Sequence, residues 1–272
     1  MAILDLRKAL TEAGKIYAEQ NDLNFQRLSD NLEFVNYNLE LPQGDLRVDG
    51  TGRSIVARKE IINRTNKPTQ PQTITFERKT EDTVTTKTTE GYEVGVSTEV
   101  STNVNVYFAE FDITVSTSFK YNTSTETTYE SKETISWTEN IPIVVPPKTK
   151  TTIDFIITIG DFNVPVSFIA TLAGGVIVNY KANPELFSFV PLTYRGLGGE
   201  SVGDILARLY NINTRVNPTD AYLLDLEGSI NLQGALGVQS STEIRNQPLA
   251  GNPLPESVQT IPGTTRNQAV FF

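Results

Sequence analysis

Apolar and polar side chains alternate across residues 92–121, and this spacing gives the segment one face suited to a nonpolar medium and one suited to water. The apolar side chains stand at even positions up to Phe108 and at odd positions from Phe111 onwards. Because successive side chains on a β-strand point to opposite faces, each arm is two-faced. The change of phase at Ala109 and Glu110 predicts an antiparallel hairpin whose two apolar faces lie on the same side.

We expect a two-residue turn at Ala109 and Glu110 in this hairpin. That turn would pair Phe108 with Phe111 and would keep the two apolar faces together. The candidate lipid-facing residues of the hairpin are Val94, Val96, Val100, Val104, Val106, Phe108, Phe111, Ile113, Val115 and Phe119.

Two kinds of protein contain hairpins with this pattern. A transmembrane β-barrel strand alternates because its side chains face lipid and a watery lumen in turn. A half-buried antiparallel sheet in a soluble protein gives the same pattern. The length favours a membrane strand, which needs about 9–11 residues where an ordinary strand has about 5–6. Thr98 and Thr102 interrupt the apolar face, and Ala-Glu is a poor two-residue turn, so the soluble alternative stays open.

The chain of 272 residues contains no histidine and no cysteine. This composition excludes Ser-His-Asp and Cys-His nucleophile systems, metal sites built on imidazole or thiolate, and disulfide bonds. The number of acidic residues leaves carboxylate chemistry such as glycoside hydrolysis open. No calcium-loop spacing occurs, however, and nothing in the sequence places two particular acids together. We therefore expect no enzymatic activity, no cofactor and no metal site.

The net charge of −9 and the isoelectric point near 4.7 argue against binding to nucleic acid, whose phosphates require a basic surface. They also argue against simple electrostatic adhesion to anionic lipid. No stretch approaches the roughly 18 apolar residues of a transmembrane helix, and residues 1–6 lack the basic leader of a secretory signal peptide. If the chain meets a membrane, we expect it to arrive folded and to insert later as β-structure.

Outside the hairpin, local patterns predict the other elements. Leucines and aromatics at helical spacings predict helices within residues 3–35, and short strands are expected from Leu39. Ser201 followed by Asp204 predicts a capped helix that begins at Val202. The tail from Asn246 is rich in proline and polar residues, so we expect an extended arm.

Serine and threonine are concentrated in two tracks, one on each side of the hairpin. Ile74, Phe76, Ile135 and Trp137 keep a strand-like rhythm beyond the tracks, so the region is not a disordered linker. The track residues are Thr83, Thr85, Thr86, Thr88, Thr89, Thr123, Ser124, Thr125, Thr127 and Thr128.

The order of these features resembles that of one protein family. A Ser/Thr track opened by residues 73–76, an alternating hairpin, a second track, a strand with Trp137 and the Val-Val-Pro-Pro-Lys segment at 144–148 follow one another. This order is similar to that of the aerolysin-type β-pore-forming toxins of the epsilon-toxin and mosquitocidal-toxin branch. Within that branch, the chain resembles the small parasporal crystal proteins of insecticidal bacilli. The likeness is good over residues 70–166 and looser over residues 226–245.

The resemblance implies a mainly β, elongated fold of long antiparallel strands and a β-sandwich, with a few short helices in a head domain. The implied divisions are a receptor-binding head at 1–66 and 167–221, long strands and sandwich at 67–91, 122–166 and 222–245, an insertion hairpin at 92–121, and a removable C-terminal tail at 246–272.

The resemblance also implies a life cycle. The protein would be made without a signal peptide, deposited in a cytoplasmic parasporal inclusion during sporulation, and active outside the cell after release. It would bind an unknown surface receptor, with glycans among the candidates, and form a homo-oligomer, commonly of seven copies, on the target-cell membrane. The tracks would face solvent in the monomer and line the upper stem of the pore, and Arg245 is the candidate protease site.

Two other interpretations stay open. A crystal or storage protein could share the fold and form no pore, and a carbohydrate-binding module could share only the long strands. Dye release from vesicles after protease treatment separates the pore-former from the storage protein, and sugar binding without oligomers would indicate the module. The head aromatics include candidates for receptor contact, although we expect most to be core: Tyr17, Phe25, Phe34, Tyr37, Phe187, Phe189, Tyr194 and Tyr210.

Overall fold

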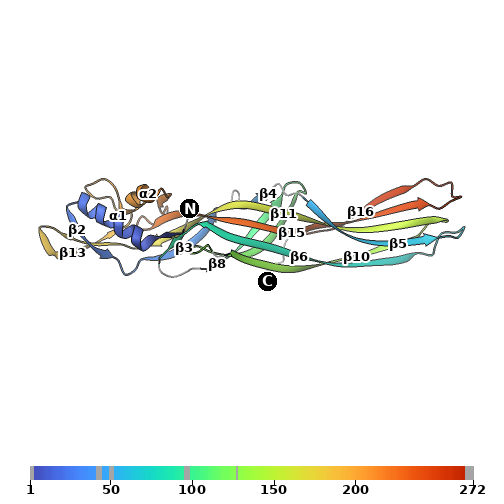
Figure 1. The fold of residues 1–272 in the computed structure, drawn as a ribbon, viewed down its shortest axis with the longest axis horizontal. Coiled ribbons are helices and arrows are strands. Elements are labelled where there is room, and N and C mark those ends of the chain that lie inside the picture. The colour runs from blue at the N-terminus through green and yellow to red at the C-terminus, as the bar shows by residue number, and fades with distance from the viewer. Residues whose placement is uncertain (1–2, 41–44, 49–51, 95–98, 127, 267–272) are drawn as a thin grey trace.

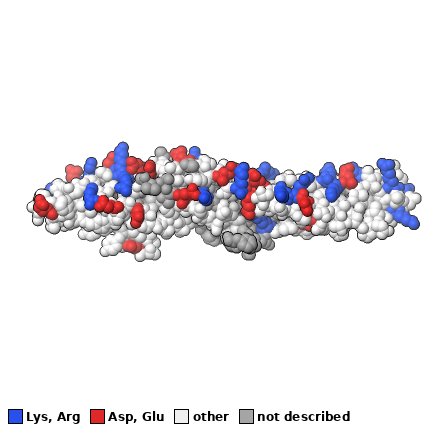
Figure 2. Space-filling view, turned by 90° about the horizontal axis from the view of Figure 1, so that it is seen from below, with Lys and Arg blue, Asp and Glu red and all other residues white. Residues whose placement is uncertain are grey.

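The structure, a computed structural model, describes residues 3–40, 45–48, 52–94, 99–126 and 128–266. The molecule is elongated, with two helices at one end and long strands that run to the other end (Figure 1). The predicted mainly β fold of long antiparallel strands is therefore confirmed. Acidic and basic side chains are interspersed along the face seen in Figure 2, and basic side chains gather at the end away from the helices.

Two long antiparallel strands form the axis of the molecule. These are β11 (Thr149–Ala173) and β15 (Leu224–Pro248), each of 25 residues. At about 3.3 Å per residue, each strand is about 80 Å long. Shorter strands pair with their outer edges: β3 (Glu33–Glu40) and β5 (Gly52–Asn63) with β11, and β6 (Gln72–Glu90), β14 (Thr214–Val216) and β16 (Ser257–Thr265) with β15.

The end away from the helices is a β-sandwich. The first half of β6 leaves β15 and pairs with β10 (Thr128–Ile143), which forms the second layer. The core between the layers contains the stacked rings of Phe76 and Phe155, whose centroids are 5.6 Å apart. The indole of Trp137 donates a hydrogen bond of 2.9 Å to the Thr80 hydroxyl.

Residues 52–63 correct the expected division of the chain. We expected them in the head, but they form β5 beside residues 149–160 of β11 and bury Ala57 in the sandwich core. Among the described residues of this N-terminal part, those from 23–28 and 33–40 pair with strands near the helices. The strands are too long to belong to one domain, so segments of the expected head extend into the body.

The head combines two helices with a three-stranded sheet. Helix α1 (Leu6–Gln20) buries Leu6, Leu10, Ala13 and Tyr17, which share one face at helical spacing. The other elements are α2 (Val202–Tyr210) and the strands β2 (Leu23–Leu28), β12 (Gly175–Tyr180) and β13 (Asn183–Pro191), in the order β13-β12-β2.

The ends of the two helices follow from local residues. The capping box of Ser201 and Asp204 is present at α2, as predicted. Helix α1 ends at Gln20, well short of the expected limit at residue 35, and β2 and β3 follow it. Asp22 in the left-handed region, with φ of 56°, turns the chain out of the helix.

The C-terminal segment is part of the sandwich over its described length. We expected an extended arm, but β15 continues to Pro248 and β16 pairs with it from Asn246 back to Gln239. Arg266, just after β16, forms an ion pair with the carboxylate of Asp82, which is only 4% exposed. The Gly237 N–H donates to the same carboxylate at 2.8 Å. The segment that we expected to be loose thus supplies the counter-charge for a buried acid.

Replacing Arg266 with glutamine should lower the free energy of unfolding by about 3 kcal/mol, because the Asp82 carboxylate then stays buried without a counter-charge. Burial raises the pKa of Asp82, against the opposing effects of the Gly237 N–H and Arg266. A carboxyl with a raised folded pKa stabilises the fold below its unfolded pKa of about 3.9, and this stabilisation is lost as the pH rises through the folded pKa. The variant should therefore lose the full amount of unfolding free energy at pH 7 and a smaller amount near pH 4.

Urea unfolding of wild type and variant at the two pH values measures this difference. Arg245→Gln, which removes a half-exposed arginine, is the matched control and should change the free energy of unfolding by about 1 kcal/mol or less. An equal deficit for Arg266→Gln at both pH values would contradict the role of the buried charge.

Candidate functional site

The alternating segment forms a hairpin of two strands, β8 (Glu99–Phe108) and β9 (Ile113–Asn122), each of ten residues. Its pairing corrects the expected register, because Phe108 lies opposite Ile113 and not opposite Phe111. Ala109 and Glu110 begin a loop that runs to Asp112, whose φ of 53° supplies the left-handed residue that Ala-Glu does not. A shift of two positions leaves every side chain on its expected face.

The apolar face of the hairpin is buried against the body of the molecule. Val104, Val106, Phe108, Ile113 and Val115 are all at most 5% exposed, and Val94 is also buried. Val100 and Phe111 are half-buried. Val96 lies outside the described residues, and so does the side chain of Phe119.

This face packs on the middle of the long strands. The ring of Phe108 meets the ring of Phe162 on β11 edge-on, with centroids 6.2 Å apart, and the ring of Tyr121 lies 5.7 Å from that of Phe168. Five large apolar side chains at about 2 kcal/mol each place on the order of 10 kcal/mol in this contact. Exposing the face to water would cost that amount, so the hairpin needs another nonpolar medium before it can leave the body.

The opposite face of the hairpin is polar. Ser101, Asn103, Ser118 and Lys120 are exposed, and the Lys120 ammonium forms a 2.8 Å ion pair with Glu99 across the two strands. These side chains would suit a hydrated surface in any state of the protein.

The outer edge of β8 is covered by a segment from elsewhere in the chain. Strand β4 (Asp45–Val48) pairs with it in parallel, and the Arg47 guanidinium lies over the Tyr107 ring at 5.5 Å from the centroid. Covering an edge in this way prevents it from pairing with another chain. The first arm can therefore pair with a neighbouring molecule only after β4 has left.

The root of the hairpin is held by the N-terminal segment. Strand β1 (Leu4–Asp5) pairs with β7 (Tyr92–Glu93), and Arg7 donates from its Nε to the Val94 carbonyl at 3.1 Å. A side chain at Gly91 would place its Cβ 2.3 Å from the Thr123 carbonyl oxygen. The two arms approach too closely here for any residue other than glycine.

Two threonines of β6 bind the main chain of β9, and we call Thr86 and Thr88 the threonine latch. The Thr86 hydroxyl donates to the Lys120 carbonyl at 2.5 Å, and the Thr88 hydroxyl donates to the Asn122 carbonyl. Both threonines are 1% exposed. Buried carbonyls at a strand edge must find a donor, and the latch supplies it from side chains.

The latch corrects our expectation that the Ser/Thr tracks face solvent. Thr86, Thr88, Thr123 and Ser124 are buried, because they lie where β6 and the end of β9 meet. The remaining described track residues are half-buried or exposed, namely Thr83, Thr85, Thr125, Thr89 and Thr128. Thr127 lies outside the described residues. The Thr86 and Thr88 hydroxyls therefore attach the hairpin to the body, while other track residues line its surface.

Arg245, the candidate protease site, lies inside the sheet. It is paired with Thr152 of β11 on one side and with Val258 of β16 on the other. A protease binds an unpaired extended segment, so cleavage here requires β16 to leave first.

The head presents aromatic side chains to solvent. Phe187, Phe189 and Tyr194 are 57%, 51% and 58% exposed, whereas Tyr17 is core. Phe25, Phe34 and Tyr210 pack partly buried against the head core, and Tyr37 against the hairpin core. Tyr222, which is 70% exposed, was not among the sequence candidates because its neighbours give no pattern that separates a surface aromatic from a buried one.

Neither of the described helices is long and apolar enough to span a membrane. Within the described ranges, no group of three or more acidic side chains is placed to hold a metal ion.

Comparisons with known proteins agree with this architecture. The family model for Clostridium epsilon toxin ETX/Bacillus mosquitocidal toxin MTX2 matches residues 28–253. A comparison with curated proteins gave no match.

Several solved structures have the same fold. The structure of the Cry23Aa1 and Cry37Aa1 binary protein complex includes a chain with 21% identity and a TM-score of 0.69, covering 97% of this chain and 98% of that one. A non-toxic crystal protein from Bacillus thuringiensis has 18% identity and a TM-score of 0.72, with 92% and 100% covered. The Mpp75Aa1.1 β-pore-forming protein from Brevibacillus laterosporus has 13% identity and a TM-score of 0.56, with 96% and 97% covered.

Replacing Thr86 and Thr88 with valine should loosen the hairpin without changing its shape. Each substitution leaves a carbonyl of β9 without its donor, buried at Asn122 and partly buried at Lys120, at a cost of about 1–3 kcal/mol. Amide hydrogen exchange in β9 should become at least tenfold faster, because local opening is favoured by that amount. Thr85→Val, on the opposite face of the same strand, is the control and should leave β9 unchanged. Unchanged exchange in the double variant would show that the latch does not hold the hairpin.

Proposed function

The chain belongs to the Clostridium epsilon toxin/Bacillus mosquitocidal toxin family, and we propose that it permeabilises membranes by inserting the β8–β9 hairpin. One observation supports this proposal above the others. The two strands of ten residues have one largely apolar face, buried around Val104, Val106, Phe108, Ile113 and Val115, and one polar face. That length matches the 9–11 residues or so of a transmembrane strand.

The proposed pore is an oligomer, because a single hairpin cannot lie stably in lipid. The unpaired N–H and C=O groups at its edges would cost several kcal/mol each in hydrocarbon. Ring closure pairs each edge with the neighbouring copy, so assembly precedes or accompanies insertion. We propose a ring of identical chains, with seven as the expected number. Asn103, Asn105 and Ser116 would then face a watery lumen, and the valines would face lipid.

The change from monomer to pore exchanges one nonpolar environment for another. Val106 and Phe108 leave the core of the body and enter hydrocarbon. The burial free energy that the apolar face loses on leaving the core is therefore similar to the free energy that it gains in lipid. The interactions that must break are polar and local: the threonine latch, the β4 pairing with β8, and the Arg7 bond to Val94. We propose that these contacts set the barrier to insertion.

The head is proposed as the part that binds the target cell. The exposed aromatics Phe187, Phe189 and Tyr194 are suited to a surface receptor, including a glycan, because aromatic rings supply large contact areas at low entropy cost. We further propose that the protein is deposited in a parasporal inclusion and acts without catalysis at the target membrane. Trimming of the C-terminal segment would require β16 to detach first.

A crystal protein that forms no pore is the second candidate. Thr102 and Thr117 interrupt the apolar face, with Thr117 opposite Val104, and weaken its lipid affinity. Such a protein would have the same fold and would release no dye from vesicles or cells. A carbohydrate-binding module would bind sugar and form no ring.

A disulfide between β4 and β8 tests whether the hairpin must leave the body. Arg47 and Tyr107 are paired across these strands, and both can be changed to cysteine without touching the core. Neighbouring strands lie about 4.8 Å apart, within the range of Cα separations that a disulfide bridges. The oxidised Arg47→Cys/Tyr107→Cys protein should bind membranes but release little dye, and reduction should restore release.

The control disulfide joins the two arms of the hairpin to each other. Asn103 and Ser118 are paired across β8 and β9, and this pairing persists in the proposed barrel. Oxidised Asn103→Cys/Ser118→Cys should therefore release dye as well as the reduced protein. The chain has no cysteine of its own, so each pair forms only one bond. Full release by the oxidised β4–β8 variant would rule out insertion of this hairpin.

A further inference from the structure

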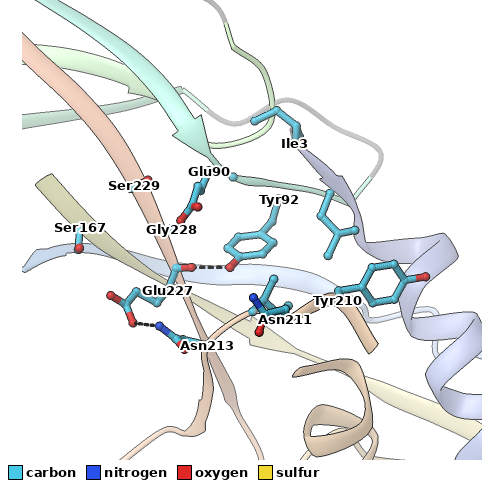
Figure 3. A pocket seen from close by; sticks show the side chains of 13 residues that line it. Ile3, Glu90, Tyr92, Ser167, Tyr210, Asn211, Asn213, Glu227, Gly228 and Ser229 are labelled. Atoms are coloured by element: carbon cyan, nitrogen blue, oxygen red, sulfur yellow. Dashed lines mark hydrogen bonds between the residues drawn. The ribbon is translucent and has the colours of Figure 1, made fainter. Parts of the chain in front are cut away.

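A cavity of about 510 Å³ lies where the head meets the long strands (Figure 3). Ser167 of β11 lines it, and four other parts of the chain complete the lining. These are the N-terminal residues Ile3 and Leu4, the end of β6 with the hairpin root at 90–92, the loop after α2 at 210–213, and the start of β15 at 227–229. Binding pockets for small molecules have volumes of roughly 300–1,000 Å³, so this cavity is large enough for one.

The charged groups of the cavity have one sign. Among the described residues that line it, Glu90 and Glu227 are the only carboxylates, and none is a lysine or arginine. Neither of them forms an ion pair within the described part of the chain, and the Glu227 carboxylate accepts the Asn213 side-chain amide at 2.8 Å. In Figure 3 both glutamates lie on the side formed by β6 and β15. Two carboxylates without a counter-charge favour a cationic ligand.

The rest of the lining is apolar or neutral. The Tyr210 hydroxyl is turned away to donate to Glu12 at 2.6 Å, which leaves the ring as part of the wall. Ile3, Leu4 and Ile212 add aliphatic surface. Aromatic and aliphatic walls beside carboxylates are suited to a cation that carries carbon groups, because the ring face attracts the charge and the aliphatic side chains cover the carbons.

We propose that this cavity binds a small organic ammonium ion. Glu90 and Glu227 neutralise the charge, the Tyr210 ring contacts the ammonium carbons, and Asn211 and Asn213 offer amides to a hydroxyl on the ligand. A bare metal ion is a poorer match, because the apolar walls cannot replace its hydration shell.

The cavity includes the hairpin root, so its ligand should also affect insertion of the hairpin, an expectation that rests on the proposed function. Gly91 and Tyr92 both line the cavity, and the Tyr92 hydroxyl donates to the Glu227 carbonyl below it. A ligand that binds only while these residues are in place stabilises the soluble form. Bound ammonium should therefore slow dye release as well as raise the unfolding temperature.

Choline is the first probe, and its neutral isostere 3,3-dimethyl-1-butanol is the matched control. Isothermal titration and thermal unfolding at constant ionic strength should detect choline and not the alcohol. Glu90→Gln should weaken choline binding about fivefold, the effect of losing a half-exposed ion pair. Glu93→Gln, on the neighbouring strand and outside the cavity lining, should leave binding unchanged.

A second arm identifies the source of the ammonium group. If a phosphatidylcholine headgroup is the source, Glu90→Gln should reduce co-sedimentation with phosphatidylcholine vesicles. If a free compound is the source, co-sedimentation should be unchanged while choline binding falls. Equal binding of choline and its neutral isostere, or choline binding that survives Glu90→Gln with Glu227→Gln, would overturn the proposal. These binding measurements do not depend on dye release, so they can succeed where the pore proposal fails.

Discussion

The contact between the apolar face of the hairpin and the middle of β11 and β15 is the interaction on which the rest of the structure depends. Val106, Phe108 and Val115 are almost fully buried there, against Phe162 and neighbouring residues. This contact needs long strands that run unbroken past the hairpin in the middle of the molecule, as β11 and β15 do (Figure 1). A flat, extended surface is needed to cover two ten-residue strands along one face.

The same contact explains why polar interactions surround the hairpin. Burial of an apolar face is non-directional. It keeps the hairpin packed on the body but does not determine which strand edge of the hairpin is paired. The threonine latch, β4 and the N-terminal segment fix the position of the hairpin, because each binds one of its edges or ends. Hydrocarbon can replace the apolar contact but not these bonds. A protein that is stable in water and able to change state in lipid needs both kinds of interaction.

Alternation along the strand was sufficient to predict the hairpin and its faces, and the Ser201 and Asp204 pattern was sufficient for α2, whereas the mainly β fold was expected from the family resemblance. The register was missed because it depends on the left-handed conformation of Asp112, which the sequence does not specify. The latch was missed because a threonine facing solvent and one facing a buried carbonyl look alike in sequence. Burial of Thr86, the sandwich position of β5 and the ion pair of Arg266 all depend on contacts between distant segments.

In the proposed insertion, the apolar face moves from the protein core into lipid while the polar face moves into water. Single cysteines at positions 103, 104, 105 and 106, each carrying an environment-sensitive fluorophore, test it directly on vesicles. Lipid-borne nitroxide should quench labels at Val104 and Val106, and aqueous iodide should quench labels at Asn103 and Asn105. Equal quenching at all four positions, or spectra unchanged from the soluble protein on vesicles that leak, would contradict the account.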